Sequence, residues 1–117
     1  MSSPTQRTLA ECRSRGWRAA VVERWIPQTQ RRLDAFGFGD VLAIGQKPWL
    51  IQATSGSNVS KRVAKITGEC AWDAAAWLDA GGGILVWGWK RYAKPVDRKW
   101  WRVIEREITL ADLGDRD

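Results

Sequence analysis

Three polar residues could form a metal site if a tight hairpin brings them together: Asp40, Gln52 and Thr54. Asp40 begins one apolar run, and the other two lie in the next run, beyond the turn Gly45–Pro48. Residues i and i+2 of a strand share a face, roughly 6.5–7 Å apart, so Gln52 and Thr54 are expected to point outward together. Pairing of the two runs would gather a carboxylate, an amide oxygen and a hydroxyl, and hard divalent cations prefer such oxygen ligands. The spacing therefore predicts a Mg²⁺ or Mn²⁺ site at the open end of the hairpin.

This layout resembles the PD-(D/E)XK nuclease superfamily, in particular its small Holliday-junction-resolvase-like members. The shared order is a helix, a strand, an Asp-bearing strand, a strand ending in an acid-x-lysine motif, a helix and a further strand, over residues 4–90. The resemblance implies that Asp40 and Gln52 hold the metal, with the backbone carbonyl of Ala53 as a third ligand. The sequence departs from the pattern at two positions, because Gln52 replaces the acid and Thr54 replaces the lysine. Glutamine still offers an oxygen to a metal, whereas threonine cannot supply the charge of a lysine.

Three further acids are alternatives for another metal carboxylate: Glu11, Glu23 and Asp34. Related nucleases often carry an acid on the first helix, but Glu11 lies four residues before Arg15, a spacing typical of a surface ion pair. Nearer to where some relatives carry the acid, the sequence has only Thr5. Glu23 would either join the metal site or pair with an arginine, and Asp34 would support the site or cap a loop. The residues expected to serve catalysis are Asp40, Gln52, Thr54, Lys61 and Glu23.

Basic residues on either side of the hairpin suggest contacts with a polyanion. The segment 55–58 is rich in helix-capping groups, and a helix N-terminus binds phosphate readily. Lys61 could replace the charge missing at Thr54, since lysine migration onto this helix is known in the superfamily; the alternative is a solvated basic face. Arg31 and Arg32 would contact DNA phosphates from a loop, or would simply be solvated there. The expected nucleic-acid-binding residues are Arg31, Arg32, Ser55, Ser57, Lys61, Arg62 and Lys65.

The elements that must position these residues follow from caps, breakers and periodicity. Ser3, Pro4 and Gln6 form a capping box with proline at the first helical position. The apolar strand 84–89 follows a helical crossover and is expected to lie parallel at the centre of the sheet. We predict an α/β, restriction-endonuclease-like fold with a mixed sheet of about five strands flanked by helices. The predicted helices are 3–15, 59–66 and 70–80, the strands 17–26, 40–44, 49–53, 84–89 and 100–108, and the loops 28–35 and 90–99, with a frayed tail from 112.

Composition limits the classes of function that the sequence can support. The 117 residues are expected to form one domain, 1–117, with a net charge of +6 that favours a polyanionic partner or serves solubility alone. The chain has no histidine, which excludes histidine general-base catalysis and His-ligated zinc. Cys12 and Cys70 are expected to be reduced, buried thiols. Most of the nine tryptophans, including Trp72, are expected to pack in the core or at its rim.

These observations predict a divalent-metal-dependent DNA endonuclease, which the resemblance directs to branched or structured DNA. The alternative is a catalytically weak or inactive DNA-binding or assembly module on the same fold, and a structural protein that uses its tryptophans at interfaces is a third option. DNA is the expected partner, and self-association into a homodimer stays open. No apolar run reaches the length of a membrane span or a signal sequence, so we expect a cytoplasmic protein with no membrane contact.

Overall fold

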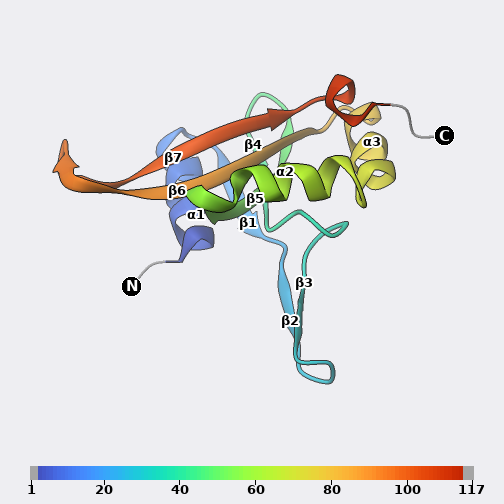
Figure 1. Ribbon diagram of the computed structural model, residues 1–117, viewed down its shortest axis with the longest axis horizontal. Coiled ribbons are helices and arrows are strands. Elements are labelled where there is room, and N and C mark those ends of the chain that lie inside the picture. Colours follow the sequence, from blue (N-terminus) through green and yellow to red (C-terminus); the bar gives the residue numbers. More distant parts are fainter. Residues whose placement is uncertain (1–2, 115–117) are drawn as a thin grey trace.

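The computed structural model describes residues 3–114 and has the expected α/β class, with a five-stranded mixed sheet flanked by helices (Figure 1). The strand order is β1-β4-β5-β6-β7. Only β5 and β6 run parallel, and the other neighbours are antiparallel. The strands of this sheet are β1 Arg18–Val21, β4 Val41–Ile44, β5 Pro48–Ser55, β6 Gly83–Val96 and β7 Lys99–Ile108.

The first helix, α1 (Pro4–Ser14), begins with the predicted capping box. The backbone N–H of Gln6 donates to the hydroxyl of Ser3 at 3.2 Å, and the N–H of Ser3 donates to Oε1 of Gln6 at 3.1 Å. Thr8 and Cys12 form the buried side of the helix against the sheet. Because the box fixes where the helix starts, it also fixes where its first turn meets the end of β5.

The central hairpin has the predicted pairing. Val41 lies opposite Ile51 and Ile44 opposite Pro48, and the backbone N–H of Asp40 extends the ladder by donating to the carbonyl of Ile51 at 3.0 Å. Because β5 is a central strand, however, both of its faces are covered. Gln52 therefore points to a buried face of the sheet and not outward as predicted.

A helical crossover joins the two parallel strands. After β5 the chain makes a 3-10 turn, η1 (Gly56–Asn58), and then forms α2 (Val59–Thr67) and α3 (Ala71–Asp79). A Cβ atom at Gly88 of β6 would lie 2.3 Å from the Val59 side chain, so only glycine lets the first turn of α2 approach this strand so closely. The start of α2 is thereby held beside the end of β5.

Two apolar layers cover the sheet. On the α1 side, Trp17 stacks on Trp49 and Trp87, with ring centroids 6.2 and 6.1 Å apart. On the other side, α2 and α3 cover the sheet with mostly aliphatic side chains, among them Ile66 and Ala74. Trp72 is 69% exposed, and the prediction that it packs in the core is wrong because α3 buries its alanine side instead.

The predicted strand 17–26 is two separate strands. β1 ends at Val21, and the backbone N–H groups of Val22 and Glu23 both donate to the carbonyl of Asp40, at 3.0 and 3.4 Å. These bonds end the pairing with β4, and the chain then leaves the sheet. β2 (Arg24–Ile26) pairs instead with β3 (Arg31–Leu33), so the predicted loop 28–35 contains a strand. We call this projecting hairpin the β2–β3 arm (Figure 1).

The predicted basic loop 90–99 is also wrong. β6 continues to Val96, turns at Asp97 and Arg98, and returns as β7, whose predicted course to Ile108 is confirmed. The far half of this hairpin, residues 90–102, extends well beyond the rest of the sheet, and we call it the β6–β7 arm (Figure 1). Sequence patterning missed it because side chains that face solvent on both faces show no apolar alternation.

The C-terminal part of the described chain is ordered where a frayed tail was predicted from Asp112. A 3-10 turn, η2 (Leu110–Leu113), buries Leu113, and the Asp112 carboxylate accepts the backbone N–H of Thr109 at 2.8 Å. The rest of the predicted tail, residues 115–117, lies outside the described residues. Among the helices of residues 3–114, none is long and apolar enough to cross a membrane.

Candidate active site at the end of the central hairpin

A polar cavity of about 470 Å³ lies where β5 leaves the sheet. Its walls come from five places: the start of α1, the base of the β2–β3 arm, the residue before β4, the end of β5, and the first turns of η1 and α2. Asp40, Gln52 and Thr54 all line it, so the structure brings together the three residues that the sequence singled out. We call it the Asp40 cavity.

Asp40 is held by two donors from β5. Its Oδ2 accepts the side-chain N–H of Gln52 at 2.6 Å and the backbone N–H of Ala53 at 2.9 Å, while the residue is only 4% exposed. Gln52, also 4% exposed, turns its nitrogen to Asp40, which leaves its Oε1 buried with no hydrogen-bond partner within residues 3–114. A buried acceptor without a partner is costly, and a bound cation would satisfy it.

The Asp40 carboxyl has an unusual pKa. Burial raises it from the ordinary 3.8 to about 7, against the opposing effect of the Ala53 N–H, and the neighbouring carboxylates of Glu23 and Asp34 raise it further. No arginine or lysine in the described chain forms an ion pair with Asp40. The negative charge of this group is therefore uncompensated by the protein, which is the condition that a divalent cation would relieve.

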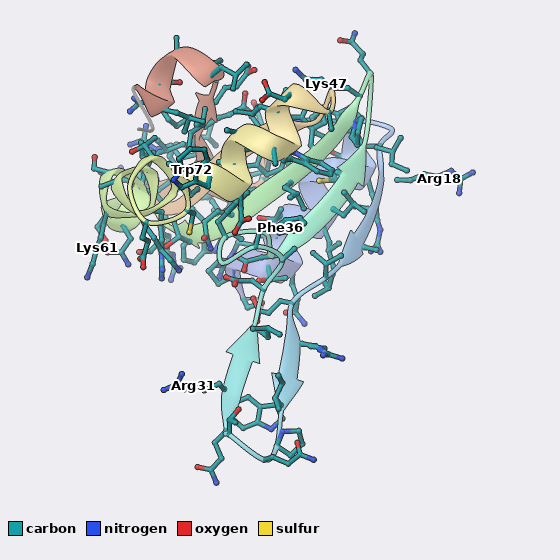
Figure 2. All side chains as sticks on the ribbon, turned by 90° about the vertical axis from the view of Figure 1, so that its right-hand side faces the viewer. Arg18, Arg31, Phe36, Lys47, Lys61 and Trp72 are labelled. Atoms are coloured by element: carbon teal, nitrogen blue, oxygen red, sulfur yellow. The ribbon has the colours of Figure 1, made fainter. Side chains whose placement is uncertain are left out.

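The predicted pairing of Glu23 with an arginine is confirmed, and Glu23 also lies beside Asp40. Its carboxylate accepts from Arg32 at 2.6 Å, and it also lines the Asp40 cavity and acts on the Asp40 carboxyl. Arg32 thus reaches the cavity from β3, while Arg31, on the same strand, is exposed and points away from the molecule (Figure 2). Asp34 lines the cavity as well. Two of the three acids considered from the sequence as a further metal carboxylate, Glu23 and Asp34, therefore lie near Asp40.

The third alternative, Glu11, lies elsewhere. It accepts from Arg15 at 2.9 Å, four residues along α1, and Arg15 also reaches Glu105 of β7 at 3.1 Å. This is the surface ion pair that the spacing predicted, and Glu11 does not line the Asp40 cavity. Thr5 does line it, from the first turn of α1. A position on this helix therefore faces the site, but it carries a hydroxyl instead of an acid.

The last residues of β5 complete the floor of the cavity. Thr54 is 6% exposed and lines the cavity with its neighbour Ala53. In an extended strand the N–H and C=O of one residue point to the same neighbour. Since the N–H of Ala53 points to Asp40, its carbonyl is directed to that side too, which agrees with the ligand expected from the sequence.

The start of α2 contributes Arg62 to the cavity. Arg62 lines it, and its Nε is buried without a hydrogen-bond partner in the described part of the chain. Asn58, one turn earlier, lines the cavity too, and its side chain makes no helix cap. Lys61 is exposed and points away from the molecule (Figure 2), and neither it nor Lys65 lines the cavity. Asn58 was not among the site residues expected from the sequence, although its i, i+4 spacing to Arg62 could have indicated it.

The two serines before α2 lie at the rim. Ser55 lines the cavity, and its hydroxyl is 3.3 Å from that of Ser57, with which it shares a hydrogen bond. Neither Ser55 nor Asn58 caps the helical segment with its side chain, contrary to the capping expected from the sequence. Polar groups thus surround the entrance next to a helix start.

The residues present fit a Mg²⁺-type site that is only partly made by protein. No cluster of three or more His, Cys, Asp or Glu side chains within residues 3–114 could hold a metal ion. Mg²⁺ commonly takes one or two carboxylates and keeps waters or substrate phosphates as its other ligands. The Asp40 carboxylate and the unpartnered Oε1 of Gln52 satisfy that demand, with Glu23 nearby.

Comparison of the chain with protein-family models, with curated proteins and with solved structures gives no match. What the cavity does must be argued from its own residues.

Proposed function

We propose that the protein is a divalent-metal-dependent DNA endonuclease that hydrolyses phosphodiester bonds in the Asp40 cavity. The observation that carries the proposal is the pairing of a buried, uncompensated carboxylate, Asp40, with the buried and unpartnered oxygen of Gln52 in a polar cavity. This arrangement costs stability and has no evident structural benefit. Costs of that kind are typical of functional sites.

The residues of the chain have separate roles in this proposal. Asp40, Gln52 and the carbonyl of Ala53 would hold Mg²⁺ or Mn²⁺. When bound, the cation would neutralise charge on the scissile phosphate and lower the pKa of an attacking water. Glu23 would orient that water and accept its proton, while Arg32 keeps the Glu23 carboxylate in place. The Thr54 hydroxyl would donate a hydrogen bond to the phosphate.

Arg62 is the residue that we assign to the charge missing at Thr54. It lines the cavity from the helix that follows β5, whereas Lys61 points to solvent. A guanidinium presents several N–H donors in a fixed plane and suits a phosphate oxygen pair. Lys61, Lys65 and Arg31 would act further out, on the DNA backbone.

The resemblance to resolvase-like nucleases extends the proposal to branched or structured DNA and to an intracellular, nucleic-acid-associated protein that can work as a homodimer. The alternative function is a DNA-binding or assembly module that does not cleave. The observation that favours it is that, within the described chain, no group of three or more His, Cys, Asp or Glu side chains could hold a metal ion. With few anionic ligands, metal affinity could fall below what turnover needs.

The deciding experiment is a cleavage assay on linear and branched DNA with Mg²⁺ or Mn²⁺, and with chelator. Cleavage that needs the cation and disappears in chelator is the expected result. Binding without cleavage under every metal condition would favour the non-catalytic module. Cleavage that persists in chelator would overturn the metal-dependent mechanism.

A further inference from the structure

The β6–β7 arm is a second basic feature, separate from the Asp40 cavity. Residues 90–102 contain six lysines or arginines and one acid, Asp97, which lies in the turn. The exposed part of β6, Lys90–Val96, has seven residues, but only Lys99–Arg102 of β7 lie opposite them, because the pairing is irregular between Arg91 and Val96. At about 3.3 Å per residue, the four residues of β7 make the paired ribbon roughly 13 Å long. Apart from the partly covered Tyr92, the side chains of Lys90–Val96 are exposed, so no core requirement explains this composition.

The positive charge of the arm is not compensated within the protein. The ion pairs among residues 3–114 involve Arg15 and Arg32, and none involves a cation of the arm. Two of the three arginines of the arm, Arg91 and Arg102, instead lie over aromatic rings. The guanidinium of Arg91 lies 4.8 Å from the ring centre of Trp100, and that of Arg102 lies 5.6 Å from that of Tyr92. Such stacking orders the arginines while their charge stays available to an outside partner.

The turn at the tip of the arm has a strained backbone, and a charged residue, Arg98, occupies one of its strained positions. Asp97 and Arg98 both have positive φ, 50° and 66°. A two-residue hairpin turn with positive φ at both positions prefers Asn-Gly or Asp-Gly. Here arginine occupies the position that glycine would adopt with less strain. Strain retained at an exposed tip is typical of a functional contact.

A continuous path links the arm to the Asp40 cavity. A second cavity, of about 300 Å³, lies at the base of the arm between Lys90, Arg91 and the start of η1. Ser55 lines both this cavity and the Asp40 cavity. The residues that line the second cavity include no acid, so a phosphate backbone lying along the arm could follow it to Ser55 at the Asp40 cavity.

We propose that the β6–β7 arm is a grip for duplex DNA, which lies along the arm with its backbone directed over Ser55 into the Asp40 cavity. The two-stranded ribbon is of the kind that the major groove admits, and its paired length of roughly 13 Å corresponds to about four base-pair steps of about 3.4 Å. Duplex DNA is favoured over a second copy of the chain because two such arms would repel each other. The inference rests on the proposed function in taking DNA as the substrate.

The test is duplex binding by the full chain in chelator, so that cleavage cannot interfere. The arm variant carries Lys94→Gln and Arg98→Gln. The matched control carries Arg18→Gln and Lys47→Gln, which lie at the opposite end of the sheet from the arm, where β1 and the turn between β4 and β5 lie near the start of β6. Both variants lose two positive charges. We expect the arm variant to lower the slope of log K against log salt by about 1.8, at about 0.9 per phosphate, and to weaken binding roughly tenfold or more at 0.1 M salt.

A second variant guards against misfolding. Arg98→Gly should relax the turn and raise the melting temperature, yet weaken duplex binding. Equal losses in the arm variant and the control would overturn the grip, as would Arg98→Gly binding like the parent. A larger loss for single-stranded DNA or RNA than for the duplex would also overturn it. The two proposals can fail separately. If the parent protein never cleaves DNA but the arm variant loses duplex binding, the nuclease proposal is refuted and the grip is kept. If the parent cleaves DNA and the arm variant cleaves equally well, the grip is refuted and the nuclease proposal is kept.

Discussion

The Asp40 cavity and the β6–β7 arm treat charge in opposite ways. In the cavity, a carboxylate is buried under two hydrogen-bond donors and beside other acids, and its pKa rises to about 7. On the arm, six cations are exposed to water, and none forms an ion pair within the described chain. A buried charge interacts strongly with its neighbours but costs desolvation free energy. An exposed charge interacts weakly because water screens it, and it costs little free energy.

This difference separates two tasks. Chemistry on a phosphodiester needs a small number of fixed groups in a site from which water is largely removed. Binding a long polyanion needs many exposed cations that release counterions, and it tolerates the loss of any one of them. Variants in the cavity should therefore change turnover and stability, and variants on the arm should change affinity and its salt dependence.

The largest effect is expected from Asp40→Asn. The change keeps the shape of the side chain but removes the strongest anionic ligand, so turnover should fall by about two to three orders of magnitude, on the order of 3–4 kcal/mol of transition-state stabilisation. Single-turnover cleavage in Mg²⁺ measures it, and Asp73→Asn on the exposed surface of α3 is the control. Duplex affinity in chelator should stay that of the parent. If Asp40→Asn cleaved as fast as the parent, the catalytic centre would have to lie elsewhere.

The second prediction concerns how the free energy of unfolding depends on pH when no metal is bound. Burial raises the pKa of Asp40 from 3.8 to about 7. At a pH between these two values, the carboxyl group is protonated in the folded state and ionised in the unfolded state. Stability should therefore fall as pH rises from about 4 to about 7, by up to roughly 4 kcal/mol from this group.

The measurement is denaturant unfolding in chelator at several pH values, for the parent and for Asp40→Asn. The variant should lack this part of the pH dependence and should be the more stable protein at pH 8. Identical pH profiles would mean that the Asp40 carboxyl ionises normally in the folded state.

A smaller effect should distinguish two neighbours on α2. Arg62→Gln removes the guanidinium that lines the cavity and should lower cleavage about tenfold, or about 1.4 kcal/mol. Lys61→Gln removes the same charge one residue earlier, from an exposed position, and should change single-turnover cleavage little. The reverse order would restore the role that the sequence suggested for Lys61.

The smallest effect is expected from Gln52→Glu, which restores the acid of the superfamily pattern. It should tighten Mg²⁺ or Mn²⁺ binding, measured by calorimetry, by roughly threefold to tenfold, because a second carboxylate would face the ion. The same change adds negative charge beside Asp40, so stability in chelator should fall. Gln46→Glu, in the exposed turn of the central hairpin, is the matched control. Unchanged metal affinity would assign Gln52 a structural role.

The sequence predicted the geometry around Asp40 because local rules determine it. A tight turn and a period of two fix which residues of a hairpin meet, and the ladder has Val41 opposite Ile51, so that Asp40 reaches Gln52. The capping box likewise placed the first turn of α1. Burial of Gln52 was missed because it depends on α2 covering that face, which no local pattern reveals.

One strand of the β2–β3 arm, β3, and the outer part of β6 were predicted as loops for a different reason. A ribbon that projects into solvent has no buried face, so the alternation that marks a strand is missing from segments such as Arg31–Leu33. The choice between Lys61 and Arg62 was missed because the chain forms η1 before α2, and a 3-10 turn shifts the direction in which later side chains point. Most polar residues of the cavity could be found from the sequence, with Asn58 an exception, but the orientation of their side chains could not.

The stack of Trp17 on Trp49 and Trp87 gives the chain an internal optical reporter. Indoles packed at 6.1–6.2 Å couple their electronic transitions, so they should contribute a strong near-ultraviolet dichroism that vanishes on unfolding. The stack lies on the α1 side of the sheet and none of its rings lines the Asp40 cavity. Spectra recorded without DNA would therefore show whether a cavity variant or an arm variant keeps the packing of the parent protein.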